Sequence, residues 1–522
     1  MRASRQTDFD VVVLGAGFGG SILASALARR GRRVLLLEKG RHPRFAIGES
    51  STPLANLLLE EVGRRFDLPE LIPFTQWGTW QRHHPEVGCG LKRGFTFYHH
   101  RPGQKFEPGT LRENEMLVAA SPNDEVADTH WYRPDFDAWS ARLAVSCGVH
   151  YSDRCALQSV ELDASRSRLR WSHEGHDQSC TAGFVVDATG PRGALSRLLP
   201  IEESPPRWMP ATQAVFAHFS GVERIDQRFP PGPGAPYAPD DAAVHHLFDG
   251  GWVWILRFNN RLTSAGGVWT GQAKRKHGWR PGPESWAELL KTFPGIAEDF
   301  ACSRLETALH WMPEVGYRAS RVVGPGWALL PSAAGFIDPL LSTGFPLALW
   351  GILRLVSLLT ERDGNEWDAS LRNYEEDTLR DLDSAEDLVS ALYAVLPDFT
   401  SFKRMALLYF AAASYSELAW RLGVSEKATA FLLRKEPQFS RACRELCERS
   451  RQAAAQGAWE TLRSELATAI PQAIAPLDAA GLSVLRKPCW YPVDAQDVIR
   501  NADKFGLQPQ VVEARLKSLV GA

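Results

Sequence analysis

The chain lacks a cysteine pattern that would hold a metal. Its eight cysteines are scattered over 522 residues, and none of them has zinc-site or CxxC spacing. This usage fits a reduced, cytoplasmic location. Cys443 and Cys447 lie four residues apart on an expected helix, and we predict that they pack rather than bind a metal.

The sequence also lacks an excess of either charge and an apolar run of membrane length. The formal net charge is −2, so neither nucleic acid nor anionic lipid is an expected partner. The N-terminus, MRASRQTDFD, has no apolar run of a signal peptide. The stretch FPLALWGILRLVSLL at 345–359 is shorter than the roughly 20 residues of a membrane span and contains Arg354. It predicts a buried core helix.

Tryptophan, by contrast, is abundant. The chain has 18 tryptophans, which suit a core and also the walls around a flat aromatic ligand. The hydrophobic content of 44% and charged content of 23% are ordinary for a globular protein. The chain length predicts about two to four subdomains.

The clearest local pattern is a strand, a glycine turn, a helix and a second strand near the N-terminus. FDVVVLG (9–15) predicts a buried strand, SILASALARRG (21–31) a helix and RVLLLEKG (33–40) another buried strand. GAGFGG (15–20) occupies the first turn, and Glu38 closes the second strand. This order predicts a Rossmann-like dinucleotide site.

Three of the four glycines in that turn have a physical reason. Gly15 allows the tight turn, Gly17 lets the backbone approach a pyrophosphate, and Gly20 lets the helix pack on the strand. The phosphates would meet free N–H groups at the helix N-terminus. Glu38 would accept a hydrogen bond from a ribose hydroxyl.

The dinucleotide-binding domain is predicted to be discontinuous, because further strands of its type return at FVVDATG (184–190) and WALLPSAAGFIDPLLSTG (327–344). Extended patterns at 212–221, 243–258 and 264–269 indicate a β-sheet inserted between them. Such an arrangement is that of FAD-dependent oxygenase-like proteins. The predicted fold is mixed α/β, with a discontinuous FAD-binding, Rossmann-like domain at 1–205 and 320–360, a substrate-side β-sheet domain at 206–319 and a C-terminal helical region at 361–522.

The C-terminal helical region carries little information about function. In RLGVSEKATAFLLRK (421–435), Gly423 is predicted to end one helix and Ser425 to cap the next. The region is expected either to cover the substrate pocket or to form an interface.

Five motifs carry a family resemblance: GAGFGG (15–20), PRFAIGESSTP (43–53), CGLKRGFTF (89–97), GGWVWILRFNN (250–260) and GFIDPLLSTG (335–344). The last matches FxxPxxSxG at Phe336, Pro339, Ser342 and Gly344. With these motifs the chain resembles the flavin-dependent halogenases, and among them the phenolic, phloroglucinol-type branch. The resemblance runs from residue 9 to about residue 360 and more weakly into the helical tail.

The resemblance implies halogenation, with chlorination expected, of a phenolic or similarly electron-rich small molecule that is free or carrier-tethered. A separate reductase would supply FADH2, which reacts with oxygen and with chloride or bromide to give hypohalous acid. Ser342, Thr343 and Gly344 are the implied halide site, where backbone N–H groups form an anion-binding concavity. Hypohalous acid would then reach an interior lysine.

Lys92 matches the family's catalytic lysine, whereas its neighbour Arg93 lies one position beyond it. The alternative is a solvated lysine at a turn. Phe95 would supply an apolar wall beside Lys92, and desolvation there would favour a neutral amine.

Four further residues are candidates on the cofactor side. Glu49 could act in catalysis by touching flavin or substrate, or it could be an ordinary loop carboxylate. Arg44, Ser50 and Arg133 suit FAD contacts, although either arginine could instead lie on the surface.

Two departures from the family pattern concern the flavin and the substrate. Trp252 and Trp254 match the family's WxWxIP motif on the substrate side, but Arg257 replaces its proline. Pro331-Ser332 replaces a Gly-Asp pair that bonds the ribityl chain. Asp338 or Ser332 could compensate, and weaker FAD binding is the resulting hypothesis.

The pairs His83-His84, His99-His100 and His245-His246 invite a metal interpretation. Neighbours on a strand face opposite sides, so a pair in an extended segment forms no chelate. One member of the second or third pair could instead line a phenol pocket and accept a proton. The competing functions are an FAD monooxygenase that hydroxylates directly, which Arg257 keeps open, and a catalytically silent flavin-binding subunit.

Overall fold

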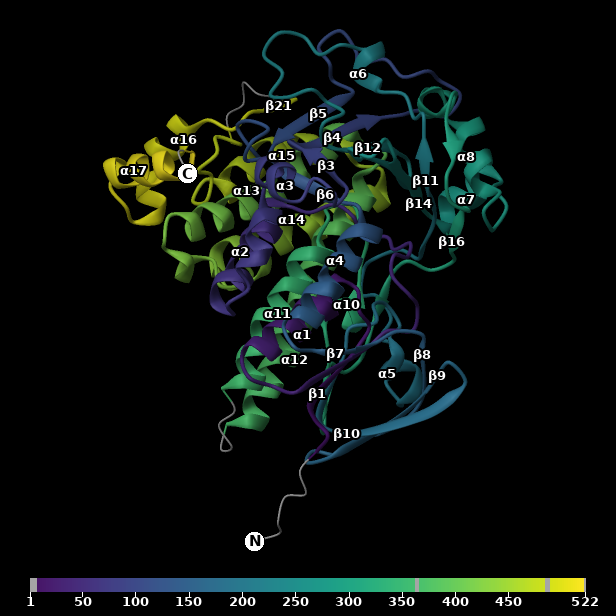
Figure 1. Ribbon diagram of the computed structural model, residues 1–522. Coiled ribbons are helices and arrows are strands. Elements are labelled where there is room, and N and C mark those ends of the chain that lie inside the picture. Colours follow the sequence, from purple (N-terminus) through teal and green to yellow (C-terminus); the bar gives the residue numbers. More distant parts are fainter. Residues whose placement is uncertain (1–6, 362–365, 484–488, 521–522) are drawn as a thin grey trace.

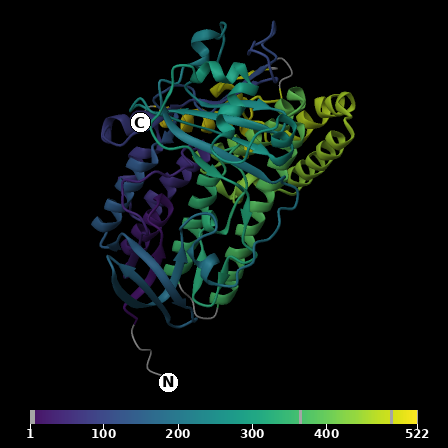
Figure 2. The same ribbon diagram turned by 90° about the vertical axis from the view of Figure 1, so that its right-hand side faces the viewer.

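The structure is a computed structural model that describes residues 7–361, 366–483 and 489–520. Two large β-sheets form its frame, one in the lower half of Figure 1 and one in the upper half. Figure 2 shows the green and yellow helices of the C-terminal third packed along one side of both sheets.

The lower sheet has eight strands, ordered β18-β19-β10-β1-β2-β7, with β8 and β9 attached through β10. Val13 lies between Leu36 and Val186 in three parallel strands, and its neighbours are apolar because such strands are covered on both faces. The predicted βαβ unit is confirmed, with helix α1 (Phe18–Arg29) starting three residues earlier than expected. The strands are β1 (Phe9–Leu14), β2 (Val34–Leu37), β7 (His150–Ser152), β8 (Cys155–Glu161), β9 (Ser167–His173), β10 (His176–Asp187), β18 (Val323–Gly324) and β19 (Trp327–Leu329).

The upper sheet has nine strands, ordered β15-β11-β14-β13-β12-β4-β5-β21, with β16 also paired to β11. Its central strands are those predicted between 212 and 269. The strands are β4 (Gly94–His99), β5 (Glu115–Ala119), β11 (Thr212–Ser220), β12 (Ala243–Phe248), β13 (Gly251–Arg257), β14 (Thr263–Thr270), β15 (Arg304–Leu305), β16 (His310–Met312) and β21 (Trp490–Tyr491).

The predicted domain boundaries differ from this arrangement. The predicted FAD-binding domain at 1–205 includes segment 94–119, but β4 pairs in parallel with β12, so this segment belongs to the upper sheet. The C-terminal region likewise contributes β21, which pairs with β5. The boundaries at 205 and 361 therefore do not separate the two sheets, because the chain crosses between them repeatedly.

Helices fill the space between and beside the sheets. Helix α11 contains the apolar run at 345–359 and is buried among α1, α2 and α12, as predicted. None of the helices in the described ranges is long and apolar enough to cross a membrane. The remaining helices are α2 (Pro53–Arg65), α3 (Trp77–His83), α4 (Arg133–Ser146), α5 (Ala194–Leu198), α6 (Ile225–Arg228), α7 (Gly271–His277), α8 (Ser285–Thr292), α9 (Pro294–Ala297), α10 (Pro331–Ala334), α11 (Gly344–Thr360), α12 (Trp367–Val395), α13 (Phe399–Arg421), α14 (Pro437–Gln456), α15 (Trp459–Ile474), α16 (Ala495–Arg500) and α17 (Pro509–Val520).

The prediction of a helix after Ser425 is wrong. Gly423 does follow the end of α13 with a φ of +66°. Beyond it, however, the chain makes only short 3-10 turns at Ser425–Lys427 and Phe431–Leu433. Leu432 and Leu433 have positive φ angles, which interrupt a regular helix.

Candidate active site

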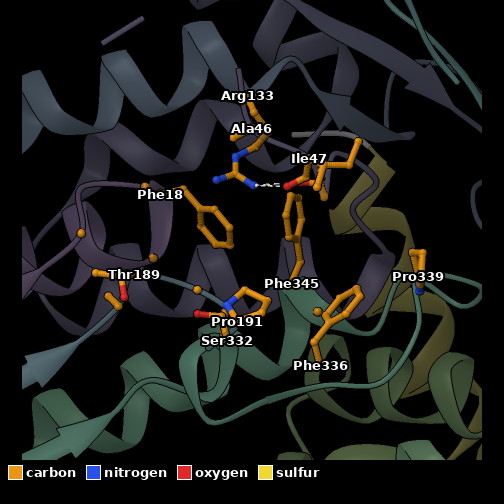
Figure 3. Close-up of a pocket in the computed structure, with 18 of the residues that line it drawn as sticks. Phe18, Ala46, Ile47, Arg133, Thr189, Pro191, Ser332, Phe336, Pro339 and Phe345 are labelled. Atoms are coloured by element: carbon orange, nitrogen blue, oxygen red, sulfur yellow. Dashed lines mark hydrogen bonds between the residues drawn. The ribbon is translucent and has the colours of Figure 1, made fainter. Parts of the chain in front are cut away.

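A cavity of about 970 Å³ opens where the turn after β1, the loop at 44–50, the upper sheet and the start of α11 converge. Figure 3 shows Phe18 and Phe345 projecting into it, with Arg133 above them and Phe336 below. A cavity of this size with a mostly apolar wall suits a large cofactor. The predicted site residues on its wall are Gly15, Gly17, Glu38, Arg44, Glu49, Ser50, Arg133, Trp252, Trp254, Ser342, Thr343 and Gly344.

The turn after β1 has the close backbone approaches that the glycine pattern predicts. Gly15 adopts a φ of +93°, which side chains rarely tolerate. A Cβ on Gly20 would lie 1.9 Å from the carbonyl oxygen of Gly15. The turn therefore offers bare backbone and the N-terminus of α1 to the cavity, as a pyrophosphate requires.

Glu38 is fixed at the end of β2 by three donors. Its carboxylate accepts from the N–H groups of Ala16 and Gly40, both at 2.8 Å, and from Arg44 at 3.2 Å. Burial opposes its ionisation, but Arg44 and the two N–H donors hold the pKa of Glu38 below its usual value. Nε of Arg44 is buried without a described partner. These groups and the glycine turn fit the ribose and pyrophosphate of FAD.

Arg133 begins α4 and holds the loop at the rim of the cavity. Its guanidinium donates to Asp137 at 2.7 and 2.8 Å and to the carbonyls of Ile47 and Gly48 at 3.1 and 3.0 Å. It also lies 4.8 Å from the Phe18 ring centroid. Arg133 is therefore a buried wall residue and not an ordinary surface arginine.

Lys92 is fully buried, at 0% exposure, at the end of β3 (Cys89–Lys92). Its Nζ donates to Ser50 Oγ at 2.9 Å and to the carbonyl of Ser51 at 2.5 Å, and it lies 4.0 Å from the Phe95 ring centroid. The alternative of a solvated turn lysine is thus wrong. Ser50 lies on the cavity wall, and Lys92 and Phe95 lie behind it.

Strand β6 (Asp128–Trp131) explains how two separate motifs meet at this lysine. It pairs with β3 and, through a bridge between His130 and Ser50, also with the segment at 43–53. The sequence offered no motif that marked β6 as the connecting strand.

Asp128 lies opposite Lys92 in the register of β3 and β6. Asn56 donates to its Oδ1 at 2.8 Å, while Oδ2 is buried without a described partner. Burial lowers the pKa of Lys92 to about 7, although Asp128 acts in the opposite direction. Burial likewise raises the pKa of Asp128 to about 7, although Lys92 opposes this. A neutral Lys92 amine is therefore accessible near neutral pH.

Glu49 contacts a residue that no sequence motif marked. His218 on β11 places Nε2 2.8 Å from Glu49 Oε1, and both side chains are almost fully buried. The second oxygen, Oε2, is buried without a described partner, and Glu49 lies on the cavity wall. Glu49 is therefore more than an ordinary loop carboxylate, since His218 fixes it at the cavity.

The loop before α11 brings the FxxPxxSxG residues to the cavity. Pro339, Ser342, Thr343 and Gly344 all line it. Ser342 has a φ of +53°, a strained conformation for a serine. Gly344 begins α11, so the first N–H groups of this helix lie at the same wall.

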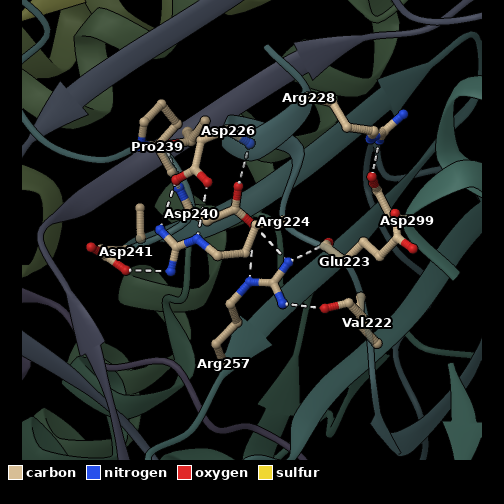
Figure 4. A network of polar contacts seen from close by, with 12 residues as sticks. Val222, Glu223, Arg224, Asp226, Arg228, Pro239, Asp240, Asp241, Arg257 and Asp299 are labelled. Carbon is tan, nitrogen blue, oxygen red and sulfur yellow. Dashed lines mark hydrogen bonds and ion pairs between the residues drawn. The ribbon is translucent and has the colours of Figure 1, made fainter. Parts of the chain in front are cut away.

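Trp252 and Trp254 face the cavity, but Arg257 does not. Side chains alternate along β13, and Arg257 falls on the opposite face. There it donates to Asp240 at 2.7 Å and to the carbonyls of Val222 and Glu223, as Figure 4 shows. The prediction that Arg257 lies on the substrate side is wrong for this reason.

Asp338 is also absent from the cavity wall, so its predicted contact with the cofactor is not supported. It is fully buried and accepts from the Tyr393 hydroxyl at 2.8 Å and from Leu340 N–H at 2.9 Å. Pro331 and Ser332 do line the cavity. Asp338 and Ser332 were the two candidates to replace the family's ribityl hydrogen-bond acceptor. Of these two residues, only Ser332 lines the cavity.

His245 lines the cavity, whereas His246 points to the other face of β12 and lies 2.9 Å from His100 Nε2. Burial lowers the pKa of His245 to about 3, which makes it a poor proton acceptor. Among the described residues, no cluster of three His, Cys, Asp or Glu side chains could hold a metal.

The glycine turn, the fixed Glu38 and the large cavity between two sheets define a dinucleotide-binding protein. The chain belongs to the tryptophan halogenase family, whose sequence profile matches residues 130–400. The profile of the NAD(P)-binding Rossmann-like domain matches residues 13–67.

The chain is also similar to individual halogenases. The chain is 28% identical over 400 residues to monodechloroaminopyrrolnitrin halogenase PrnC of Pseudomonas fluorescens, over 75% of this chain and 69% of that protein. It is 31% identical over 348 residues to tetracycline 7-halogenase of Kitasatospora aureofaciens, over 64% of this chain and 60% of that protein. The crystal structure of halogenase PltM with phloroglucinol and FAD matches with a TM-score of 0.83 at 25% identity, covering 93% of this chain and 99% of that chain. The chain is thus a flavin-dependent halogenase that uses FAD, oxygen and halide.

Proposed function

We propose that this halogenase chlorinates a phenolic or similarly electron-rich aromatic compound through hypohalous acid and Lys92. The phenolic class is supported by the match to PltM over nearly the whole chain, since that structure holds phloroglucinol. Other relatives are named for pyrroles on a peptidyl-carrier protein. A free phenol is therefore the proposed substrate, and a tethered pyrrole is an outcome of the test.

The burial of Lys92 beside Ser50 is the observation that carries the proposal. When bound, FAD supplies the chemistry that turns halide and oxygen into hypohalous acid. The neutral Lys92 amine takes the halogen from hypohalous acid and releases water. The resulting haloamine passes the halogen to the ring, whose displaced proton returns to the amine. In its protonated form, Lys92 would instead donate a hydrogen bond that polarises hypohalous acid.

The halide is proposed to bind at Thr343 and Gly344. The N-terminal N–H groups of α11 and the strained backbone at Ser342 support this placement, because such groups attract anions. A separate flavin reductase is proposed as the source of FADH2. The glycine turn between β1 and α1 is proposed to bind FAD, and FADH2 would then come from that separate protein.

The alternative function, direct hydroxylation, was favoured by Arg257, and the position of Arg257 does not support it. Arg257 points away from the cavity and is held by Asp240, so it does not open a path between substrate and flavin. The two tryptophans of the same strand still form the cavity wall.

Product mass tests the proposal. Purified protein with FADH2 from an added reductase is given phenol, pyrrole and indole panels with chloride or with bromide. We expect a phenol to gain one halogen in place of hydrogen, with the mass following the halide. A product that gains oxygen without halide would establish hydroxylation, and flavin binding without turnover would favour a silent subunit.

The variant Lys92→Ala tests the role of the lysine. We expect it to lose halogenated product by at least a hundred-fold, the lower range for a proton- or group-transfer residue, while FADH2 oxidation continues. Arg93→Ala is the matched control, because Arg93 follows directly but pairs with Asp124 at 2.6 Å. Halogenation retained in Lys92→Ala would remove Lys92 from the mechanism.

A further inference from the structure

Tyr393 lies at the centre of a buried hydrogen-bond chain that joins three parts of the fold. Nε1 of Trp252 on β13 donates to the Tyr393 hydroxyl at 2.9 Å. That hydroxyl donates to Asp338 Oδ2 at 2.8 Å, and Asp338 Oδ1 accepts from Leu340 N–H at 2.9 Å. All three side chains are buried. These hydrogen bonds therefore link the upper sheet, the loop at 338–344 and helix α12.

One end of this hydrogen-bond series reaches the cavity, and the other end lies next to a residue of its wall. Trp252 forms part of its wall, and Pro339, the neighbour of Asp338, forms another part. A second tyrosine supports the same loop, since the Tyr409 hydroxyl on α13 donates to the carbonyl of Leu341 at 2.8 Å. Two helices of the C-terminal region thus hold the loop from outside.

The loop needs such support. Ser342 has a positive φ, and a residue in this conformation persists only where its surroundings enforce it. The Asp338 carboxylate is the anchor of the loop, and burial raises its pKa to about 7, whereas the Tyr393 hydroxyl stabilises its charged form.

We propose that Tyr393 is a positioning residue for the halide: by holding Asp338 and Trp252 together, its hydroxyl sets the conformation of the loop at 338–344 and couples the substrate-side wall to halide affinity. This inference rests on the proposed halide site at Thr343 and Gly344. It gives the C-terminal helical region a role in halide binding.

The variant Tyr393→Phe tests the inference by removing one oxygen atom. Tyr374→Phe is the matched control, because Tyr374 is also buried on α12 and its hydroxyl donates to the carbonyl of Leu329 at 2.7 Å. Two readouts are compared: the bromide concentration at half-maximal product formation, and the bromide dependence of the absorbance of bound oxidised FAD. Thermal unfolding reports the general cost of losing a buried hydroxyl.

We expect Tyr393→Phe to raise the half-saturating bromide concentration roughly ten-fold in both readouts, as loss of a buried hydrogen bond can. Tyr374→Phe should lose similar thermal stability and leave the bromide response unchanged. Equal bromide responses in the two variants would overturn the inference and leave halogenation intact. A wild-type protein without saturable bromide response would instead overturn the halide site. If Tyr393→Phe does not fold, Asp338→Asn replaces it, because asparagine keeps the size of the side chain. The inference then requires that Asp338→Asn weaken the bromide response and that Tyr374→Phe leave it unchanged.

Discussion

At the level of single residues, the proposed role of Lys92 in halogenation depends on how its amine is desolvated. The lysine has polar partners in Ser50 and Ser51, and none of the carboxylates within residues 7–361, 366–483 and 489–520 forms an ion pair with it. Asp128 acts on it through space from the neighbouring strand. The two groups titrate as a pair, so each one sets the charge of the other.

Replacing Asp128 by asparagine tests this coupling. Because the Asp128 charge raises the pKa of Lys92 against the effect of burial, Asp128→Asn should lower that pKa further below about 7. The acidic limb of the pH profile for halogenation should then move to lower pH. The pH profile of FADH2 oxidation without substrate is the control and should stay in place. An unmoved acidic limb would show that Asp128 does not set the state of Lys92.

Part of the site could be predicted residue by residue, and the reason is chemical. Lys92, Ser342 and Gly344 belong to short motifs of the family resemblance, so the sequence could place them near one cavity. Their roles in the reaction stay predictions. Asp128 and His218 act only across strands, where sequence spacing carries no signal. Arg257 was misplaced although alternation along β13 could have put it opposite the two tryptophans.

At the scale of elements, the turn between β1 and α1 separates two uses of glycine. A Cβ on Gly20 would overlap Gly15 O at 1.9 Å, whereas a Cβ on Gly17 would meet Arg133 at 3.4 Å and Asp137 at 3.6 Å. Gly20 is therefore required for packing, whereas Gly17 is proposed to serve the approach of the cofactor.

Alanine substitutions should reveal this difference. Gly17→Ala should keep the thermal unfolding temperature of the FAD-free protein and weaken FAD binding at least ten-fold, about 1.4 kcal/mol. Gly20→Ala should lower the unfolding temperature itself or prevent folding, because backbone must move. Calorimetry and FAD titration on both proteins check this. Equal loss of stability in the two variants would contradict it.

Elements were predictable where one hydrophobic period dominates. The Val- and Leu-rich strands and α11 have continuous apolar runs, and their positions match the structure within a few residues. The segment after Ser425 has the apolar spacing of a helix, but packing holds Leu432 and Leu433 at positive φ. Tertiary contacts override local preference there.

At the scale of the whole molecule, buried titratable groups link stability to pH. The pKa of His245 falls from an ordinary 6.5 to about 3 on burial. Between these values the unfolded chain binds a proton that the folded protein does not, so folding stability decreases as pH falls. Each pH unit in this window costs about 1.4 kcal/mol.

The variant His245→Gln isolates this contribution. On going from pH 7 to pH 5, the wild type should lose about 2 kcal/mol more stability than the variant. Asp128 and Asp338 have raised pKa values that act in the opposite direction, but both proteins contain them, so the comparison cancels their effect. Urea unfolding of both proteins at the two pH values measures the difference. A difference independent of pH would show that His245 is not buried neutral.

The interleaving of the two sheets has a consequence for the synthesis of the chain. Strand β1 leaves the ribosome first, yet its neighbour β10 ends at Asp187 and β19 ends only at Leu329. Strand β5 ends at Ala119, but its partner strand β21, at Trp490–Tyr491, is synthesised more than 300 residues later. Pairing over such separations is slow, and incomplete sheets expose unpaired edges meanwhile. The enzyme can therefore acquire neither its cofactor cavity nor its complete second sheet until most of the polypeptide has been made.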